Sequence, residues 1–544
     1  MLESRNEIYQ QKQTEIGVSI IGDVHTFQSQ PSQISSNADL LNAYRGEQQK
    51  TKILGISEAT FDNITRFAAE IAGTAILLFL GCGSCIKGLG QEPTNLMTNL
   101  SFGFAVTAII TMFGHISGAH LNPSVTILAL VFRTISPVMA VFYVIAQVIG
   151  AIVGYGFIVA MTPTDVFGLQ EGMCTTTVHE TMNLGEAFLV EFLCTAILIF
   201  TVCGVWDPRT GKLQDSASIR VGLVVAVLSI VGGPYTGASM NPARSIAPAI
   251  YTGVFDDQWL YWVAPPLSAL CIAYLYKFVF WREDPERKNI RMNAATMDRI
   301  SEFLAELLGT ALLLFFGCSS CIVGLGPIPE HFVICLTFGL AVMLIVNIFG
   351  CISGSHLNPA VTVAATIYKL ITPTQAAIYM AGQFIGGFVG FGVLKAITPA
   401  QIFRPENSTG PGLCTTIPNP DVSSLQAFTV EFIISAVLIL ICCAVWDPRN
   451  ANHHDSVPLR FGLAITCLAL VGGPYSGGSM NPARSLAPAL WNGDFDQHWI
   501  YWLAPLLAAA LTTPFYLIVF RRETPSEKPE KSSGEDFPLR TNNV

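Results

Sequence analysis

The sequence predicts an all-α membrane protein with two six-helix domains, and three observations lead to that prediction. Only 12% of its 544 residues are charged and 51% are hydrophobic, whereas soluble proteins carry about 25% charged residues. Apolar runs of about 20 residues, the length that spans a bilayer, recur along the chain. The motifs of the first half return in the second half.

Composition also excludes several classes of function. The net charge of −9, from 29 basic and 38 acidic residues, offers no basic face for nucleic acid. The 14 cysteines lie mostly in apolar runs, and no second pair or histidine cluster follows the CxxC pairs Cys82/Cys85 and Cys318/Cys321. We therefore expect these thiols to be structural filler, and we expect no metal, no cofactor and no enzyme activity.

The internal repeat defines the domains. FGHISGAHLNPSVT (113–126) returns as FGCISGSHLNPAVT (349–362), and VGGPYTGASMNPARS (231–245) returns as VGGPYSGGSMNPARS (471–485). The offsets are nearly equal, at 358 − 122 = 236 and 481 − 241 = 240. The predicted parts are a polar cytosolic tail 1–60, a first domain 61–282, a cytosolic linker 283–299, a second domain 300–522 and a polar cytosolic tail 523–544.

Twelve membrane spans are expected, six in each domain. They fall near 67–86, 98–117, 137–161, 184–206, 219–236, 259–280, 303–324, 332–352, 374–397, 426–446, 460–476 and 499–520. Each half also repeats within itself, since AAEIAGTAILLF (68–79) resembles LVEFLCTAILIF (189–200). Three spans per quarter give successive quarters opposite orientations, which is the inverted-repeat pattern of membrane transport folds.

Basic residues set the orientation. They follow the fourth and sixth spans: Arg209, Lys212, Arg282, Arg287, Lys288, Arg291, Arg521 and Arg522. The positive-inside rule makes that side cytosolic, so both termini are expected inside, and the plasma membrane is the expected location.

Four Asn-Pro motifs predict four short helices. Asn is a preferred N-cap and Pro a preferred first helical residue, and an apolar stretch of about ten residues follows each motif. Such a helix crosses about half of a bilayer, so two of them would meet at the midplane, with their Asn amides facing a lumen. The motif residues are Asn122, Pro123, Ser124, Asn241, Pro242, Ala243, Asn358, Pro359, Ala360, Asn481, Pro482 and Ala483.

Charged residues recur in the apolar segments. The midspan glutamates are Glu70, Glu191, Glu306 and Glu431. An intramembrane carboxylate suggests either proton coupling or support of nearby backbone, and we favour support of the loop N–H groups, because no basic partner lies in the same helix. Arg244 and Arg484 lie on the first turn of a short helix, where the dipole opposes a cation; a lumen-facing charge that rejects cations is expected.

These motifs resemble the paired NPA boxes of the aquaporin (major intrinsic protein) family, over about 60–282 and 300–522. The resemblance implies two aquaporin-like domains, each with six helices and two re-entrant half-helices, and an assembly with four pores. Two chains would supply these four pores as a pseudo-tetramer. It also implies a constriction in each half, formed by Phe102, Ser229, Ala238 and Arg244 and by Phe338, Ala469, Gly478 and Arg484.

The constriction residues indicate permeation of small neutral solutes as well as water. Water-selective members usually place His where this chain has Ser229 and Ala469, and the pattern resembles the insect entomoglyceroporins. We therefore expect a passive channel for water, glycerol and urea that excludes ions and protons, with the second pore at least as permeable to solutes as the first. Ser245 and Ser485 resemble water-type members instead, so a water-selective channel is the alternative.

The sequence also allows other interpretations of the function. A coupled secondary transporter also uses inverted repeats and broken helices, and a junctional or signalling protein could keep the fold with a closed pore. Each half holds a full set of motifs, so two joined genes are a further alternative. Asn407 begins a glycosylation sequon in a predicted outer loop, and Cys174 and Cys414 in matching outer loops are expected to be free or locally packed thiols rather than bridged.

Overall fold

The computed structural model describes residues 52–53, 56–87, 93–168, 172–211, 213–281, 294–325, 328–403, 411–450 and 454–521. The chain divides into two units, Met1–Thr65 and Arg66–Val544. Within the first unit, β1 (Lys52–Ile53) and β2 (Ile56–Ser57) pair antiparallel. Most of the predicted tail 1–60, all of the predicted tail 523–544, most of the predicted linker and Asn407 lie outside the described residues.

The first half is built from six long helices and several short ones. Its elements are α3 (Glu58–Gly83), α4 (Asn95–Ser117), α5 (Pro123–Val131), α6 (Pro137–Met161), α7 (Thr164–Gly168), α8 (Leu184–Trp206), η1 (Pro208–Thr210), α9 (Ala217–Thr236), α10 (Pro242–Thr252) and α11 (Gln258–Val279).

The second half repeats this order. Its elements are α12 (Ala294–Ser319), α13 (His331–Ser353), α14 (Pro359–Ile367), α15 (Pro373–Ile397), α16 (Ala400–Phe403), α17 (Ser424–Val445), η3 (Pro448–Asn450), α18 (Val457–Ser476), α19 (Pro482–Asn492) and α20 (Ile500–Val519).

Twelve of the described helices are long and apolar enough to cross a membrane, so the prediction of an all-α fold with twelve spans is confirmed. The first helix of each half begins before the predicted span, at Glu58 and Ala294. Residues 294–299 therefore belong to α12, although we expected them in the linker. The physical reason is that hydropathy marks only the apolar part of a helix, whereas the polar first turns continue the same hydrogen-bonded ladder.

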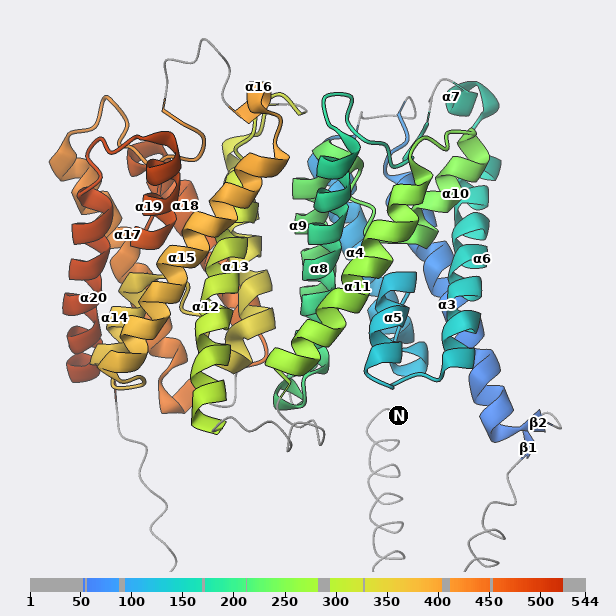
Figure 1. The fold of residues 1–544 in the computed structure, drawn as a ribbon, viewed down its shortest axis with the longest axis horizontal. Helices are drawn as coiled ribbons and strands as arrows, with labels where there is room; N and C mark the ends of the chain where they lie inside the picture. The colour runs from blue at the N-terminus through green and yellow to red at the C-terminus, as the bar shows by residue number, and fades with distance from the viewer. Residues whose placement is uncertain are drawn as a thin grey trace, which may run out of the picture. The chain divides into compact units, whose positions relative to one another are not determined.

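The four Asn-Pro motifs begin four short helices, as expected. Asn122, Asn241, Asn358 and Asn481 are the N-caps of α5, α10, α14 and α19, with Pro in the first turn of each helix. These helices contain 9, 11, 9 and 11 residues. Figure 1 shows α5 and α10 one above the other among the long helices of the first half, and α14 and α19 in the same arrangement in the second.

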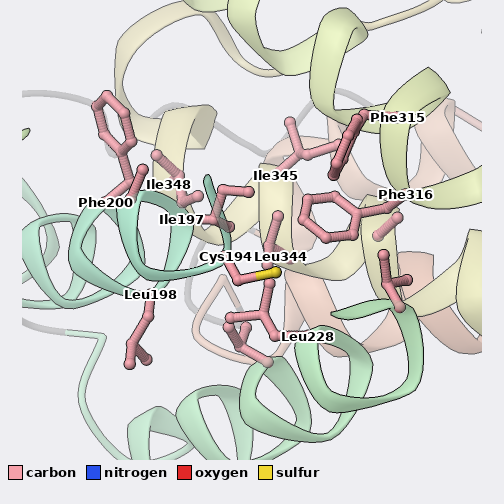
Figure 2. Packing of buried hydrophobic residues seen from close by; sticks show 14 of the residues in the cluster. Cys194, Ile197, Leu198, Phe200, Leu228, Phe315, Phe316, Leu344, Ile345 and Ile348 are labelled. Atoms are coloured by element: carbon pink, nitrogen blue, oxygen red, sulfur yellow. The ribbon is translucent and has the colours of Figure 1, made fainter. Parts of the chain in front are cut away.

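The two halves pack against each other through a shared apolar core. Figure 2 shows side chains of α8 and α9, among them Ile197 and Leu228, next to Phe316 and Leu344 of α12 and α13. The helices approach closely, since a Cβ added to Gly204 would lie 2.7 Å from the carbonyl oxygen of Asn347. Between membrane-spanning helices, such close packing stabilises the contact through many van der Waals interactions.

A buried arginine adds polar contacts between the halves. The guanidinium of Arg220, which is 3% exposed, donates to the side-chain oxygen of Asn347 and to Asp455, the latter at 3.3 Å. The backbone N–H of Ser216 donates to the same Asp455 carboxylate at 2.8 Å. These bonds satisfy a buried charge, so they fix how the two halves meet.

A repeated ion pair closes the loop after the fourth helix of each half. Arg449 donates two hydrogen bonds to Asp447, at 2.8 and 2.7 Å, and a third to the carbonyl oxygen of Phe520 at 2.9 Å. Its hydrogen bond lowers the pKa of the Asp447 carboxyl below the usual range. Arg209 and Asp207 form the matching pair in the first half, so in each half this loop is tied to the end of the sixth helix.

Candidate functional site

The two Asn-Pro loops of each half are joined by reciprocal hydrogen bonds. The amide nitrogen of Asn122 donates to the carbonyl oxygen of Met240, and that of Asn241 donates to the carbonyl oxygen of Leu121, both at 2.8 Å. In the second half Asn358 and Asn481 repeat both bonds at 2.8 Å. Each amide oxygen also accepts from backbone N–H groups of its own helix, so each Asn is held rigidly at the junction of two helix N-termini.

A buried glutamate holds each Asn-Pro loop. Glu70 accepts from the backbone N–H groups of His120 and Leu121, both at 2.9 Å, from the Ser117 hydroxyl at 2.6 Å and from Gln147 at 2.8 Å. The other three glutamates make corresponding bonds to their loops at 2.6–2.9 Å: Glu191, Glu306 and Glu431. All four are 0% exposed, and their oxygens are occupied by loop donors.

The loops need this support because their backbone is unusual. Ala119 and Leu121 have φ of 45° and 56°, and Ala238 and Met240 have φ of 45° and 53°. Non-glycine residues adopt this left-handed region rarely, at a cost of about 1–3 kcal/mol each. N–H groups in such turns have no helical partner, and an unpaired buried N–H is costly, so the carboxylate stabilises a conformation that the chain alone would not keep.

The four predicted constriction residues of the first half line one cavity. The guanidinium carbon of Arg244 lies 4.9 Å from the ring centroid of Phe102, and one guanidinium nitrogen donates to the carbonyl oxygen of Cys174 at 2.8 Å. Ser229 and Ala238 line the same cavity, which also reaches Asn122 and Asn241. The opening beside the arginine is therefore bordered by a ring, a hydroxyl and a methyl group.

The second half repeats this geometry with smaller side chains. Arg484 lies 4.8 Å from the ring centroid of Phe338 and donates to the carbonyl oxygen of Cys414 at 2.9 Å. Ala469 and Gly478 line its cavity, together with Asn358 and Asn481. The cavities measure about 890 and 300 Å³, but the first also extends along residues 319–333 of the second half, so the two volumes do not compare the widths of the constrictions.

The remaining predicted residues lie behind the cavities. The motif prolines and third residues are buried in the first turns of the short helices: Pro123, Ser124, Pro242, Ala243, Pro359, Ala360, Pro482 and Ala483. They set the direction of each helix, whereas the Asn and Arg side chains border the cavity.

Sequence reasoning missed three groups of residues. His120 and His356 line the cavities, and their repetition beside the Asn-Pro motifs was an available signal. A Cβ added to Gly81 would lie 2.3 Å from the Phe102 ring, so this glycine makes room for the constriction ring. The turn that carries Cys174 supplies the carbonyl partner of Arg244, and its repetition around Cys414 was an available signal.

One expectation about the cysteines was wrong. We expected Cys414 to be a free or locally packed thiol and Cys318 to be filler, but these two residues form a disulfide, with Cα atoms 5.3 Å apart. The loop that contains Cys414 lies next to the end of α12. Because the two cysteines are 96 residues apart in the sequence, local spacing could not predict that they are neighbours. In the first half Cys174 is a free thiol, as expected.

Both halves of the chain are similar to known proteins. The family model described as "Major intrinsic protein" matches residues 57–276 and 293–516. Aquaporin-4 of Mus musculus is 40% identical over 217 residues, which cover 39% of this chain and 66% of that relative's length. Aquaporin-2 of Ovis aries is 35% identical over 229 residues, which cover 42% of this chain and 82% of the relative.

A solved structure, the aquaglyceroporin from Plasmodium falciparum, is 25% identical to this chain, with a TM-score of 0.38. The match covers 40% of this chain and 96% of that structure. The two aquaporin alignments are each about the length of one half of this chain.

Replacement of the buried glutamate tests its role in the fold. Glu70→Gln puts an amide NH₂ where two donors already point, so we expect a loss of about 1.5–3 kcal/mol in the free energy of unfolding. Thermal unfolding in detergent measures it, with Glu186→Gln, at a half-buried capping residue, as the matched control. Equal shifts in the two variants would contradict a special role for Glu70.

Proposed function

Because the chain belongs to the major intrinsic protein family, we propose that each half is a passive transmembrane channel for water and small neutral solutes such as glycerol and urea. The observation that carries this proposal is the small side chain beside each constriction arginine. Ser229 and Ala238 border the cavity near Arg244, and Ala469 and Gly478 border the cavity near Arg484. Ser229 and Ala469 are smaller than the imidazole that water-selective members usually place at this position.

The chemistry of the lining suits a polyol or urea. The guanidinium and the Asn amides offer hydrogen-bond donors to a solute oxygen, while Phe102 and Ala238 offer apolar surface to its carbons. A solute that enters must replace its water hydrogen bonds, since an unpaired polar group costs about 1–3 kcal/mol. A molecule with hydroxyl groups along one edge meets this condition, and so does water.

Ions are rejected by the same groups. The N-termini of α5 and α10 meet at the Asn pair, and each carries a partial positive charge that disfavours cations. Arg244 adds a full positive charge. Pore diameter, lining donors and such barriers are already established as the selectivity elements of this family.

A coupled transporter is the less favourable interpretation. A coupling ion would need a carboxylate that is free to bind it. The four midspan glutamates are already acceptors of loop hydrogen bonds, as Glu191 is for Ser239 and Met240.

A water-selective channel is the alternative, because Ser245 and Ser485 resemble water-type members. Ser245 is fully buried, and its hydroxyl bonds to Thr176 at 2.8 Å, whereas the residues around the cavity are Ser229, Ala238 and Arg244. We give more weight to the residues that border the permeant, so the broader channel is our proposal.

We further infer that the channel lies in the plasma membrane with both termini cytosolic. The twelve spanning helices make the chain a multi-pass membrane protein, and the basic residues after the fourth and sixth helices of each half support this orientation.

Two chains are proposed to assemble into a group of four pores. The helices that join the two halves, α8 and α13, have repeat equivalents, α17 and α4, that are more exposed. In the most apolar stretch of each helix, 72% of residues are buried in α8 but 39% in α17, and 67% are buried in α13 but 28% in α4. Met112 and Val437 are 43% and 39% exposed, while their repeat equivalents Ile348 and Ile197 are 0% and 2% exposed. The α17 face of one chain therefore suits the α4 face of another, by the same contacts that join the halves.

Adding a ring to each constriction tests the permeant. In Ser229→His/Ala469→His, the imidazole fills the space beside the arginine, so glycerol and urea uptake should fall while osmotic water flux persists. Labelled-solute uptake and light scattering of vesicles containing the full chain measure both. Met161→His, at an exposed position, is the control, and a parent protein that excludes glycerol would favour the water-selective alternative.

Bulky substitutions on the open faces test assembly. We expect native mass spectrometry to find two chains per particle for the parent, and one chain for Met112→Trp/Val437→Trp, because overpacking costs about 1–3 kcal/mol at each contact. Leu511→Trp, at a position on α20 that is 56% exposed, should keep two chains. Four chains per particle, or no response to the paired substitutions, would contradict the proposed contact.

A further inference from the structure

Each half has three cysteines in the same arrangement, two of which line the cavity while the third is buried behind them. In the first half, Cys82 and Cys85 lie one turn apart at the end of α3, and Cys174 lies in the turn that faces them. The sulfur atoms of Cys85 and Cys174 are 2.9 Å apart, and Cys82 is buried. The equivalents in the second half are Cys318, Cys321 and Cys414.

The two halves hold these thiols in different states. Cys318 and Cys414 form a disulfide, while Cys321, one turn further along, is a free thiol. In the first half all three cysteines are free. Equivalent cysteines are therefore disulfide-bonded in the second half and free in the first half.

The loop cysteine is directly coupled to the constriction arginine. The Cys174 carbonyl oxygen accepts a hydrogen bond from Arg244 at 2.8 Å, and its sulfur lies 3.4 Å from the second guanidinium nitrogen. Its backbone has φ of 55°, in the left-handed region. Since the sulfur and the carbonyl belong to one strained residue, a bond from that sulfur to α3 restrains the group that positions Arg244.

We propose that these three cysteines in each half form a thiol–disulfide site, whose bond ties the end of the first helix to the turn that positions the constriction arginine. The proposal rests on the proposed channel function, because it assigns a regulation to the same constriction. The first pore changes between a dithiol and a disulfide state, and the second pore contains the disulfide state.

The oxidant is a low-molecular-weight disulfide such as oxidised glutathione. The Cys174 thiolate attacks one of its sulfur atoms, forming a mixed disulfide and releasing one small thiolate. The thiolate of Cys82 or Cys85 then attacks the Cys174 sulfur and releases the second small thiolate. One protein disulfide forms, the two electrons reduce the small disulfide, and the two protons of the protein thiols pass to the two small thiols.

The surroundings of Cys174 favour this reaction. Cys85 and Cys174 both line the cavity, so a small reagent can reach them from the mouth. Burial alone would raise the pKa of Cys174, but hydrogen bonds from Cys82 and Cys85 and the charge of Arg244 lower this pKa well below its usual value. The thiolate is the attacking species, so this environment activates the loop cysteine.

The test uses the full chain with the second pore filled by Ala469→Trp, reconstituted in vesicles. Vesicles are equilibrated in buffers of reduced and oxidised glutathione, and the cysteine pairs are mapped by mass spectrometry after alkylation. We expect a Cys174 disulfide to increase with oxidation and glycerol permeability to fall about fivefold relative to water permeability, a modest coupling between sites. Reduction should reverse both, and Cys174→Ser should abolish both.

Further variants locate the partner and control for other thiols. Cys82→Ser and Cys85→Ser show which thiol bonds to Cys174, and Cys271→Ser, at an exposed thiol on α11, should leave the response unchanged. No Cys174 disulfide in any buffer, or one that forms without a change in permeability, overturns the proposal. If no buffer gives any flux, the channel function fails, and the mapping alone then supports or overturns the thiol site.

Discussion

The hydrogen bonds between four buried carboxylates and the Asn-Pro loops are the contacts on which the rest of the structure depends. A loop at the bilayer midplane has no water to satisfy its backbone, and this one also contains residues in the left-handed region. Glu70 and Glu306 supply acceptors from the side of the loop, while the Asn amides join the two loops end to end. With both ends fixed, the short helices leave the Asn and Arg side chains beside an open cavity.

Duplication adds a second constraint, because each half must bury a face that another domain would otherwise cover. The chain meets it by packing α8 and α9 of the first half against α12 and α13 of the second. Arg220, buried and bonded to Asn347, and Gly204, which permits close approach, belong to this contact. The halves differ at Gly204 and Asn347, whose equivalents are Ala444 and Thr111, and at their constrictions, while Arg220 and its equivalent Arg460, the glutamates and the Asn-Pro pairs are the same in both.

Periodic and repeated features could be predicted from the sequence, and contacts between distant loops could not. The spans near 137–161 and 184–206 agree with α6 and α8, because an apolar run of that length has few other solutions. The start of α12 was missed, since polar first turns carry no hydropathy signal. Likewise, the Cys318–Cys414 bond and the contact of Gly81 with Phe102 depend on loop return and helix packing, which one sequence without an alignment does not encode locally.

We propose that one chain holds two independent pores. Water and glycerol permeability of vesicles containing full-length Ser229→Trp, Ala469→Trp and the double variant test it most directly. Each indole fills one constriction, so each single variant should keep part of both fluxes, the two parts should sum to the flux of the parent, and the double variant should lose both. If one substitution abolishes all flux, or if the double variant still conducts, the permeant does not pass through two separate constrictions and the account is wrong.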